Sequence, residues 1–378
     1  MSRVDKRSAA VVVEVAVVGG GQAGLAMSHQ LSRAGVDHVV LEAESVTGAS
    51  WARRWDSLRL FTPAGYSALP GMPFPGGVGS HPGKDEVARY LGSYADAFRL
   101  PIERNARVVL LRRKDGLFRL ETPSRAYDAR RVVVATGAFG SPWTPPVATR
   151  VASNVAQLHA DRYRGPRDVP PGRVVVVGAG NTGCQLALEL ARASREVILA
   201  GRSIRALPQR LLGRDLFWWL DQTGLVRVPA DSALGRLLRA NDPVIGTTSR
   251  MLRRAGVARA GRVIAADDDG LVFDDGARVA ADAVIWATGY RHDDRWIHVP
   301  GALDETGALL LDGLDTPVPG LHAVGRPWQR TRGSALIGFV GVDASELTAR
   351  IVRTHPVGAS SESTSGTQVV GDEVARER

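Results

Sequence analysis

The stretch VVVEVAVVGGGQAG, residues 11–24, decides the fold. It begins with a β-branched run that is interrupted only by Glu14 and Ala16, which is typical of a buried parallel strand. Three glycines follow, and residues 23–34 then repeat apolar side chains at helical spacing. A second apolar run lies at residues 39–41. A strand, a turn, a helix and a strand in this order predict a βαβ unit in an α/β fold.

The turn in this unit fits the spacing GxGxxG, which is typical of a dinucleotide site. The first glycine permits the tight turn, the second lets a pyrophosphate approach the backbone, and the third lets the helix pack closely on the strand. The helix N-terminus adds partial positive charge. Glu42 ends the next strand, where a carboxylate can accept both ribose hydroxyls of an adenosine. The residues predicted for this site are Gly19, Gly21, Gln22, Ala23, Gly24 and Glu42.

A second βαβ unit spans residues 173–200 and carries GAGNTG as its turn. No carboxylate ends its second strand; Arg202 and Ser203 follow there instead. A guanidinium can pair with a 2′-phosphate through two hydrogen bonds, so this site is expected to prefer NADPH to NADH. The alternative is that Arg202 is an ordinary surface residue of an arginine-rich chain. The residues predicted for this site are Gly178, Gly180, Asn181, Thr182, Gly183, Arg202 and Ser203.

The tripeptide Ala-Thr-Gly ends two further apolar strands, at residues 135–137 and 287–289. Glycine lets the chain leave a sheet at the edge where nucleotides bind. Such turns suit crossings between two domains, although either could be an ordinary strand end. The site residues predicted here are Thr136, Gly137, Thr288 and Gly289.

Composition narrows the classes of function. The 378 residues are 44% hydrophobic and 23% charged, which is typical of a globular chain of two or three domains. Cys184 is the one cysteine, which excludes a disulfide framework, a zinc cluster of several thiolates and a redox CxxC pair, and favours a cytoplasmic location. The net charge of +9 comes from dispersed arginines, so no nucleic-acid surface is expected. No stretch reaches the ~20 apolar residues of a membrane span, and no metal site is expected.

The order of fingerprint, Ala-Thr-Gly, fingerprint and Ala-Thr-Gly resembles that of the flavin-containing monooxygenases. The chain is most similar to their short bacterial branch, and the resemblance covers roughly residues 14–352. Further shared strings are Ser50-Trp51, residues 56–60, Leu69-Pro70-Gly71, residues 73–75, residues 180–184, residues 320–325 and residues 331–334.

The resemblance implies FAD at the first site and NADPH at the second, in two Rossmann-like dinucleotide-binding domains. The NADPH domain, residues 166–283, is expected to be inserted into an FAD domain of residues 1–165 and 284–356, with a disordered tail at 357–378. The resemblance also implies cofactor contacts at Ser50, Trp51, Thr62, Val108, Gly325 and Ser334.

The same resemblance implies the chemistry. NADPH reduces the flavin, O2 forms a C4a-(hydro)peroxyflavin, and one oxygen atom passes to a small organic amine, sulfide or ketone. No protein nucleophile is needed, so the catalytic residues remain unassigned. Phe61-Thr62 stands where the family has Asn-Thr, which leaves open a flavin oxidoreductase or oxidase that inserts no oxygen. A non-catalytic nucleotide sensor linked to transport is the third possibility. Residues 51–74 and 216–220 either line a substrate pocket or pack in the core.

Overall fold

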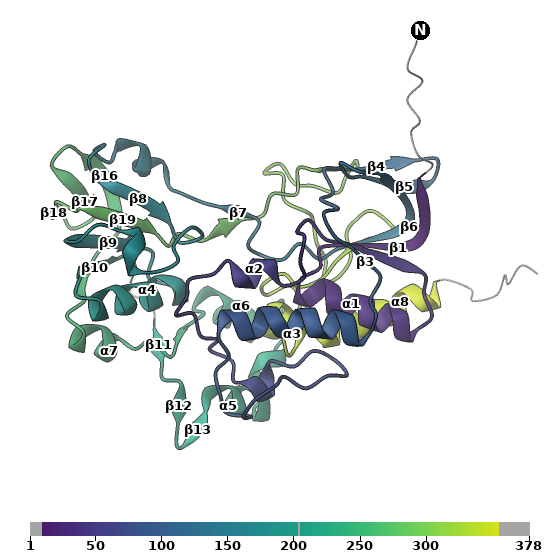
Figure 1. The fold of residues 1–378 in the computed structure, drawn as a ribbon, viewed down its shortest axis with the longest axis horizontal. Helices are drawn as coiled ribbons and strands as arrows, with labels where there is room; N and C mark the ends of the chain where they lie inside the picture. The colour runs from purple at the N-terminus through teal and green to yellow at the C-terminus, as the bar shows by residue number, and fades with distance from the viewer. Residues whose placement is uncertain (1–9, 203–204, 355–378) are drawn as a thin grey trace, which may run out of the picture.

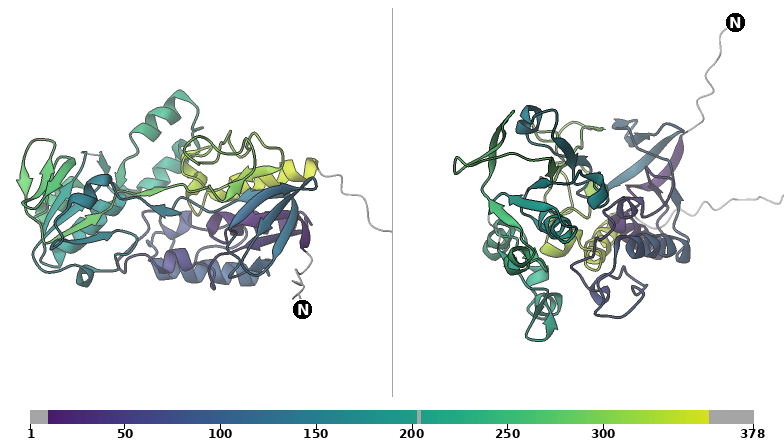
Figure 2. Two further views of the ribbon diagram at one scale, coloured as in Figure 1. Left: turned by 90° about the horizontal axis from the view of Figure 1, so that it is seen from above. Right: turned by 60° about the vertical axis from the view of Figure 1, so that its left-hand side comes forward.

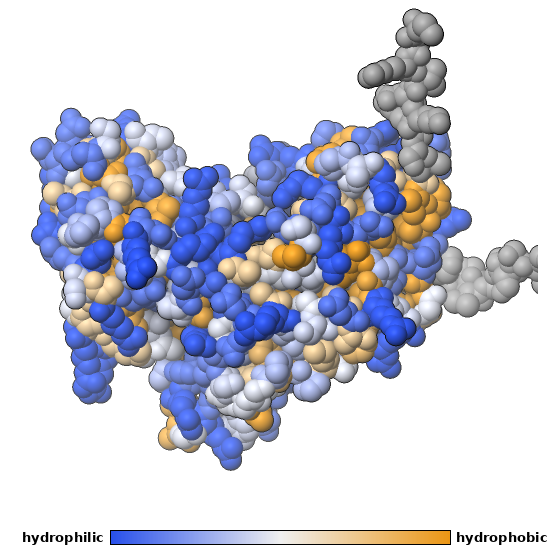
Figure 3. Space-filling view, viewed as in Figure 1, coloured by the Kyte–Doolittle hydropathy of each residue, from blue (hydrophilic) through white to orange (hydrophobic). Residues whose placement is uncertain are grey.

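The computed structural model describes residues 10–202 and 205–354, which fold into two lobes around separate sheets (Figures 1 and 2). The outline of the surface is notched between the lobes, and hydrophilic side chains cover much of the face that Figure 3 shows. Ser203 and the predicted tail at 357–378 lie outside the described residues.

The first lobe contains an eight-stranded sheet in the order β21-β4-β5-β6-β1-β2-β3, with β22 also paired to β6. β1 lies between β2 and β6, parallel to both, as its apolar run predicts. Val15 and Val17 face one core of the lobe, while Val13, Ala16 and Val18 face the other. The strands are β1 (Val11–Val18), β2 (His38–Leu41), β3 (Ile102–Glu103), β4 (Leu110–Lys114), β5 (Leu117–Glu121), β6 (Ala126–Val134), β21 (Ile297–His298) and β22 (Leu321–Ala323).

Three helices cover one face of this sheet: α1 (Gln22–Arg33), α3 (Lys84–Ala97) and α8 (Val340–Arg353) (Figure 1). Their buried side chains, such as Leu25, Leu91 and Leu347, form one core with β1. β4 begins at Leu110, and the chain before it bonds to the residue that follows β2. The long stretch between β2 and α3 is irregular except for α2 (Ala49–Ala52) and the 3-10 turn η1 (Ala64–Tyr66).

The second lobe contains a five-stranded parallel sheet in the order β15-β10-β9-β19-β8. Helix α4 packs on β9 and β10 and also contacts helix α7. The small sheet β16-β17-β18 contacts the 3-10 turn η2 (Pro146–Arg150). The elements are β8 (Ala156–His159), β9 (Arg173–Val177), α4 (Asn181–Arg192), β10 (Glu196–Ala200), α7 (Ser249–Arg254), β15 (Ala258–Ala260), β16 (Val263–Asp267), β17 (Gly270–Phe273), β18 (Arg278–Val279) and β19 (Ala283–Trp286).

The chain passes between the lobes at β7 (Ser141–Pro142) and β20 (Tyr290–Arg291), which pair as an antiparallel ribbon. The sequence placed these crossings at 165/166 and 283/284. Strand pairing corrects both positions, because β8 and β19 pair with each other and β19 pairs with β9. Both strands therefore belong to the second sheet.

Residues 205–246, here called the bridging segment, leave the second sheet and pack on the first lobe. Leu216 and Phe217 enter a core that also holds Phe339, and Ala230 N donates to Arg330 O at 2.7 Å. The segment therefore ties the two lobes together (Figure 1). Its elements are β11 (Ala206–Leu207), β12 (Arg210–Leu211), β13 (Arg214–Asp215), α5 (Leu216–Gln222), η4 (Leu225–Arg227), α6 (Ala233–Ala240) and β14 (Val244–Ile245).

Candidate functional site

The first glycine turn has the geometry that a pyrophosphate site requires. Gly19 has φ +110°, and a Cβ there would lie 2.6 Å from Ala135 O, so the turn sits against the first Ala-Thr-Gly string. A Cβ at Gly24 would lie 1.8 Å from Gly19 O, which makes glycine necessary for helix-on-strand contact. At Gly21 no described atom lies within 4 Å of the Cβ position, which leaves the backbone open to a phosphate.

Glu42 is held in position at the end of β2. Its Oε2 accepts from Gly20 N at 2.6 Å and its Oε1 accepts from Glu44 N at 2.8 Å. Each oxygen keeps a further lone pair, so the carboxylate can still accept ribose hydroxyls. The Glu42 carbonyl accepts from Ala106 N, which places Val108 just beyond this strand end.

The N-terminus of α1 brings together segments that are distant in sequence. Trp51 Nε1 donates to Gln22 Oε1 at 3.1 Å, and Gln22 Nε2 donates to Ala335 O at 3.3 Å. Gly325 has φ +87°, and a Cβ there would lie 2.3 Å from Ala23 Cβ. Trp51 and Gly325, two of the residues that the resemblance implied for cofactor contacts, therefore lie beside the start of α1.

Two of the predicted site residues with hydroxyl groups form hydrogen bonds within the protein through their side chains. Thr62 is buried, and its Oγ1 accepts from Ser67 Oγ at 2.9 Å. Ser334 is buried, and its Oγ accepts from two backbone N–H groups of the turn before η5 (Arg332–Ala335). Both side chains therefore stabilise their own loops. Ser50, in contrast, is exposed on α2.

The second glycine turn repeats the geometry of the first. Gly178 has φ +112°, and a Cβ there would lie 2.3 Å from Ala287 O in the second Ala-Thr-Gly string. A Cβ at Gly183 would lie 1.7 Å from Gly178 O, whereas the Cβ position of Gly180 has no described atom within 4 Å. Asn181 Oδ1 accepts from Ile245 N at 2.9 Å, so this side chain fixes β14 beside the turn. Thr182, the next residue, lies in the first turn of α4.

The strand end beside this turn carries two arginines. Arg202 is exposed where β10 ends. Arg259 Nη2 donates to the carbonyls of Gly201 and Arg202 at 3.4 Å each. Sequence reasoning missed Arg259; its place in β15, the strand that pairs with β10, only becomes visible in the sheet order.

The surroundings of Cys184 and His159 indicate that both residues have structural roles. Burial raises the pKa of the Cys184 thiol to about 11, which leaves it protonated and unreactive beneath the turn. His159 Nε2 lies 3.1 Å from Gly289 O, and burial lowers the pKa of this imidazole. The crossing is fixed further by Thr288 Oγ1, which donates to Trp143 O at 2.5 Å, and by left-handed Gly137 and Gly289.

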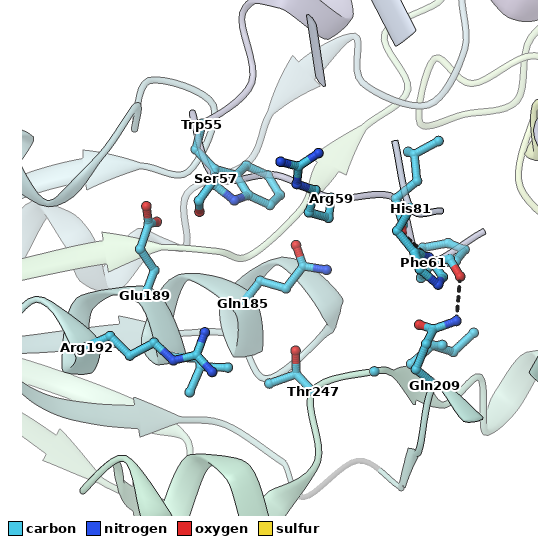
Figure 4. A pocket seen from close by; sticks show the side chains of 14 residues that line it. Trp55, Ser57, Arg59, Phe61, His81, Gln185, Glu189, Arg192, Gln209 and Thr247 are labelled. Atoms are coloured by element: carbon cyan, nitrogen blue, oxygen red, sulfur yellow. Dashed lines mark hydrogen bonds between the residues drawn. The ribbon is translucent and has the colours of Figure 1, made fainter. Parts of the chain in front are cut away.

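A pocket of about 460 Å3 lies where the two lobes meet (Figure 4). One wall is a face of α4 that carries Gln185, Glu189 and Arg192; the opposite wall comes from residues 55–61. Gln209 of the bridging segment closes one end, and its Nε2 donates to Phe61 O at 2.9 Å. Residues 51–74 therefore do line a pocket in part. The other pocket residues were missed, because they come together from separate segments.

An ion pair between His81 and Asp215 joins the first lobe to the bridging segment beside this pocket, with Nε2 and Oδ2 3.3 Å apart. The hydrogen bond to Asp215 raises the pKa of His81. Burial raises the pKa of Asp215, but hydrogen bonds from His81, Phe217 and Gln209 outweigh this effect and lower it overall.

These shifts predict a pH-dependent stability. The contribution of His81 is fully present below its unfolded pKa of about 6.5 and is lost as the pH rises through its folded pKa; that of Asp215 is lost only in acid, below about pH 4. We expect His81→Gln to lower Tm by roughly 1–2 °C at about pH 5.5, equivalent to about 0.5–1 kcal/mol, and by less at about pH 8. Thermal unfolding at both pH values checks this. An equal loss at both would show that the pair carries no charge-dependent stability.

Comparison with known proteins identifies the family. The model of the pyridine nucleotide-disulphide oxidoreductase family matches residues 16–209. A CzcO-like oxidoreductase of Geobacillus kaustophilus is 40% identical over 339 residues, which cover 89% of this chain and 97% of the relative. The chain belongs to this oxidoreductase family.

The resemblance of this chain to the flavin-containing monooxygenases is also confirmed. The flavin-containing monooxygenase of Stenotrophomonas maltophilia is 29% identical with a TM-score of 0.75, and the match covers 91% of this chain and 99% of that one. A probable indole-3-pyruvate monooxygenase of Arabidopsis thaliana is 27% identical and covers 85% of this chain and 84% of its own length. The protein is an oxidoreductase of the flavin monooxygenase group with the predicted α/β fold of two dinucleotide-binding lobes.

Relatives in this family bind FAD and NADP. The helices of the described ranges, 10–202 and 205–354, are too short or too polar to cross a membrane. Within the same ranges, His, Cys, Asp and Glu side chains form no group of three suited to a metal ion.

Proposed function

We propose that the protein is a monooxygenase that holds FAD in the first lobe, holds NADPH in the second, and transfers one atom of O2 to a small organic substrate. The observation that carries this proposal is the repeated geometry of the two glycine turns. In each turn the first and third glycines touch backbone where a Cβ would clash, and the middle one is open. Two such turns suit two dinucleotides within one chain.

The bound cofactors would supply hydride transfer and oxygen activation. The residues of the chain would bind these cofactors and hold them in position. The space at the Cβ positions of Gly21 and Gly180 would let the pyrophosphates approach the backbone of each turn, and Glu42 would be the ribose acceptor of the first site. The ribbon of β7 and β20, with the bridging segment, holds the two sites in a defined relation.

A second candidate is an NADPH-dependent flavin oxidoreductase or oxidase that inserts no oxygen. Phe61 favours it, because this half-buried ring stacks on Phe217 with centroids 5.8 Å apart, where the family has an asparagine. An aromatic ring offers no amide to hold a polar oxygen species.

The balance of NADPH, O2 and hydrogen peroxide separates the two candidates. The FAD-loaded protein is mixed with NADPH in air, with and without a panel of amines, sulfides, ketones and organic acids. A monooxygenase yields an oxygenated product and correspondingly less peroxide with one panel member. Peroxide equal to the NADPH consumed, with every panel member, would favour the oxidase.

The preference for NADPH is expected to depend on Arg202. Loss of a charged pair with the 2′-phosphate costs about 1.5–3 kcal/mol, so Arg202→Ala should raise the KM for NADPH roughly 10- to 100-fold. The KM for NADH should change little, because NADH lacks the phosphate. Arg259→Ala should have a smaller effect in the same direction, since Arg259 holds the carbonyls of Gly201 and Arg202. Steady-state kinetics with both coenzymes measures this, and Arg254→Ala on α7 is the charge-matched control. Equal effects on both coenzymes would remove Arg202 from the phosphate site.

A further inference from the structure

The pocket between the lobes adjoins both predicted cofactor sites. Ile245 lines it, and the Ile245 N–H bonds to the side chain of Asn181 in the second glycine turn. Phe61 also lines it and is followed directly by Thr62, which the family resemblance placed at the flavin. A molecule in this space would therefore lie between the two cofactors. The volume of 460 Å3 is within the range of about 300–1,000 Å3 typical of small-molecule sites.

The charges of the pocket favour an anion. In the part of the chain that the structure describes, Arg192 has no ion-pair partner, and it projects from the α4 wall together with Gln185 (Figure 4). Arg59 lies on the opposite wall and pairs with Glu86 at 3.1 Å, with both side chains largely exposed. An ion pair so exposed is weak and leaves the guanidinium available.

Glu189 is the carboxylate among the residues that line the pocket. Glu189 Oε2 accepts from Tyr163 OH at 3.1 Å. Burial raises the pKa of Glu189, against the lowering effect of hydrogen bonds from Ser57 and Tyr163, so its proton is held more firmly than on a free carboxyl group. The lining thus holds two guanidinium groups, of Arg59 and Arg192, against this one carboxylate.

The remaining lining is apolar. Trp55 is 6% exposed, and Leu60, Phe61 and Leu188 complete a hydrophobic surface beside the two arginines. An anion-binding end joined to an aromatic and aliphatic surface matches an amphipathic ligand with one charged group. A guanidinium binds a carboxylate through two parallel hydrogen bonds, which gives orientation as well as affinity.

We propose that this pocket binds the substrate as a small organic acid, with its carboxylate on Arg192 and Gln185 and its apolar body against Trp55 and Phe61. This inference rests on the proposed function, because it names the substrate class of that reaction. The carboxylate is bound and not consumed, so the oxidised group lies at the apolar end of the ligand.

Binding to the FAD-loaded protein tests the inference without turnover. Isothermal titration calorimetry compares phenylacetate with phenylacetamide, which has nearly the same shape and no charge. We expect phenylacetate to bind at least tenfold more tightly. Arg192→Ala should remove most of that difference, and Arg192→Lys should keep part of it, since lysine retains the charge without the planar fork. Arg254→Ala, an exposed arginine of α7 in the same lobe, should leave it unchanged.

Three results would overturn the inference: equal affinity for acid and amide, an unchanged preference in Arg192→Ala, or full competition between phenylacetate and NADP+. The last would mean that the pocket holds part of the coenzyme. Failure of the proposed function is a separate result, because it shows as peroxide release equal to NADPH consumption even when the acid binds as expected.

Discussion

Gly24→Ala is expected to yield protein that purifies without flavin. A Cβ at this position would lie 1.8 Å from Gly19 O, and both partners are backbone, so neither can rotate away. The helix must move off the strand, and that displaces the backbone of the glycine turn that a pyrophosphate would approach. Overpacking of this kind costs about 1–3 kcal/mol, and the displacement occurs where binding depends on it most. We expect FAD content to fall to less than a tenth of that of the unmodified protein.

The flavin absorbance per protein, measured after purification and again after incubation with excess FAD, checks this expectation. Gly92→Ala is the matched control. Gly92 lies within α3, and no described atom is within 4 Å of its Cβ position, so an added methyl group should be harmless there. Circular dichroism of both variants separates loss of FAD from loss of fold. Full FAD content in a folded Gly24→Ala variant would place the cofactor elsewhere.

The parts of the fold that follow from the sequence are those encoded by short, continuous patterns. The second βαβ unit, predicted over residues 173–200, is found as β9 (Arg173–Val177), α4 (Asn181–Arg192) and β10 (Glu196–Ala200). Both glycine turns also lie between a strand and a helix. In these units a β-branched run, a glycine turn and helical periodicity adjoin one another, so local preference and tertiary fold agree.

The crossings between lobes could not be predicted, because they depend on long-range strand pairing. β8 is the sequence AQLH, which has no β-branched residue, and it becomes a strand because it pairs with β19. The structure of the bridging segment could not be predicted either, for a related reason. Its strands are only two residues long, and Phe217 is buried by aromatic rings from the first lobe, not by its own helix neighbours.

The residues of the candidate site also fall into two groups, those that the sequence reveals and those that it does not. Residues of the glycine turns are recognisable because their spacing is itself the signal. Arg259, Gln209 and Arg192 carry no such signal, since Arg259 comes from β15, Arg192 from α4 and Gln209 from the bridging segment. Arg192 in particular looks like one more arginine at the end of a helix until residues 55–61 are placed opposite it. Its chemistry follows from the meeting of the lobes.

Gly183→Ala is expected to retain FAD and lose reduction by NADPH. A Cβ here would lie 1.7 Å from Gly178 O, the same backbone clash as at Gly24, but in the second lobe. Because the first glycine turn belongs to a different sheet, its geometry should be unaffected. We expect anaerobic flavin reduction by NADPH to slow at least 100-fold, about 2.7 kcal/mol, while dithionite still reduces the flavin at the rate seen in the unmodified protein.

Together, the two variants test independently which cofactor each lobe binds. Gly24→Ala should remove the flavin itself, and Gly183→Ala should leave a yellow protein that its coenzyme cannot reduce. If Gly183→Ala also lost FAD, the two lobes would have to fold as one cooperative unit through the bridging segment, where Phe217 shares a core with Phe339 of the first lobe. If it were still reduced at full speed, NADPH would have to deliver hydride without using the second glycine turn, and the assignment of that lobe would fail.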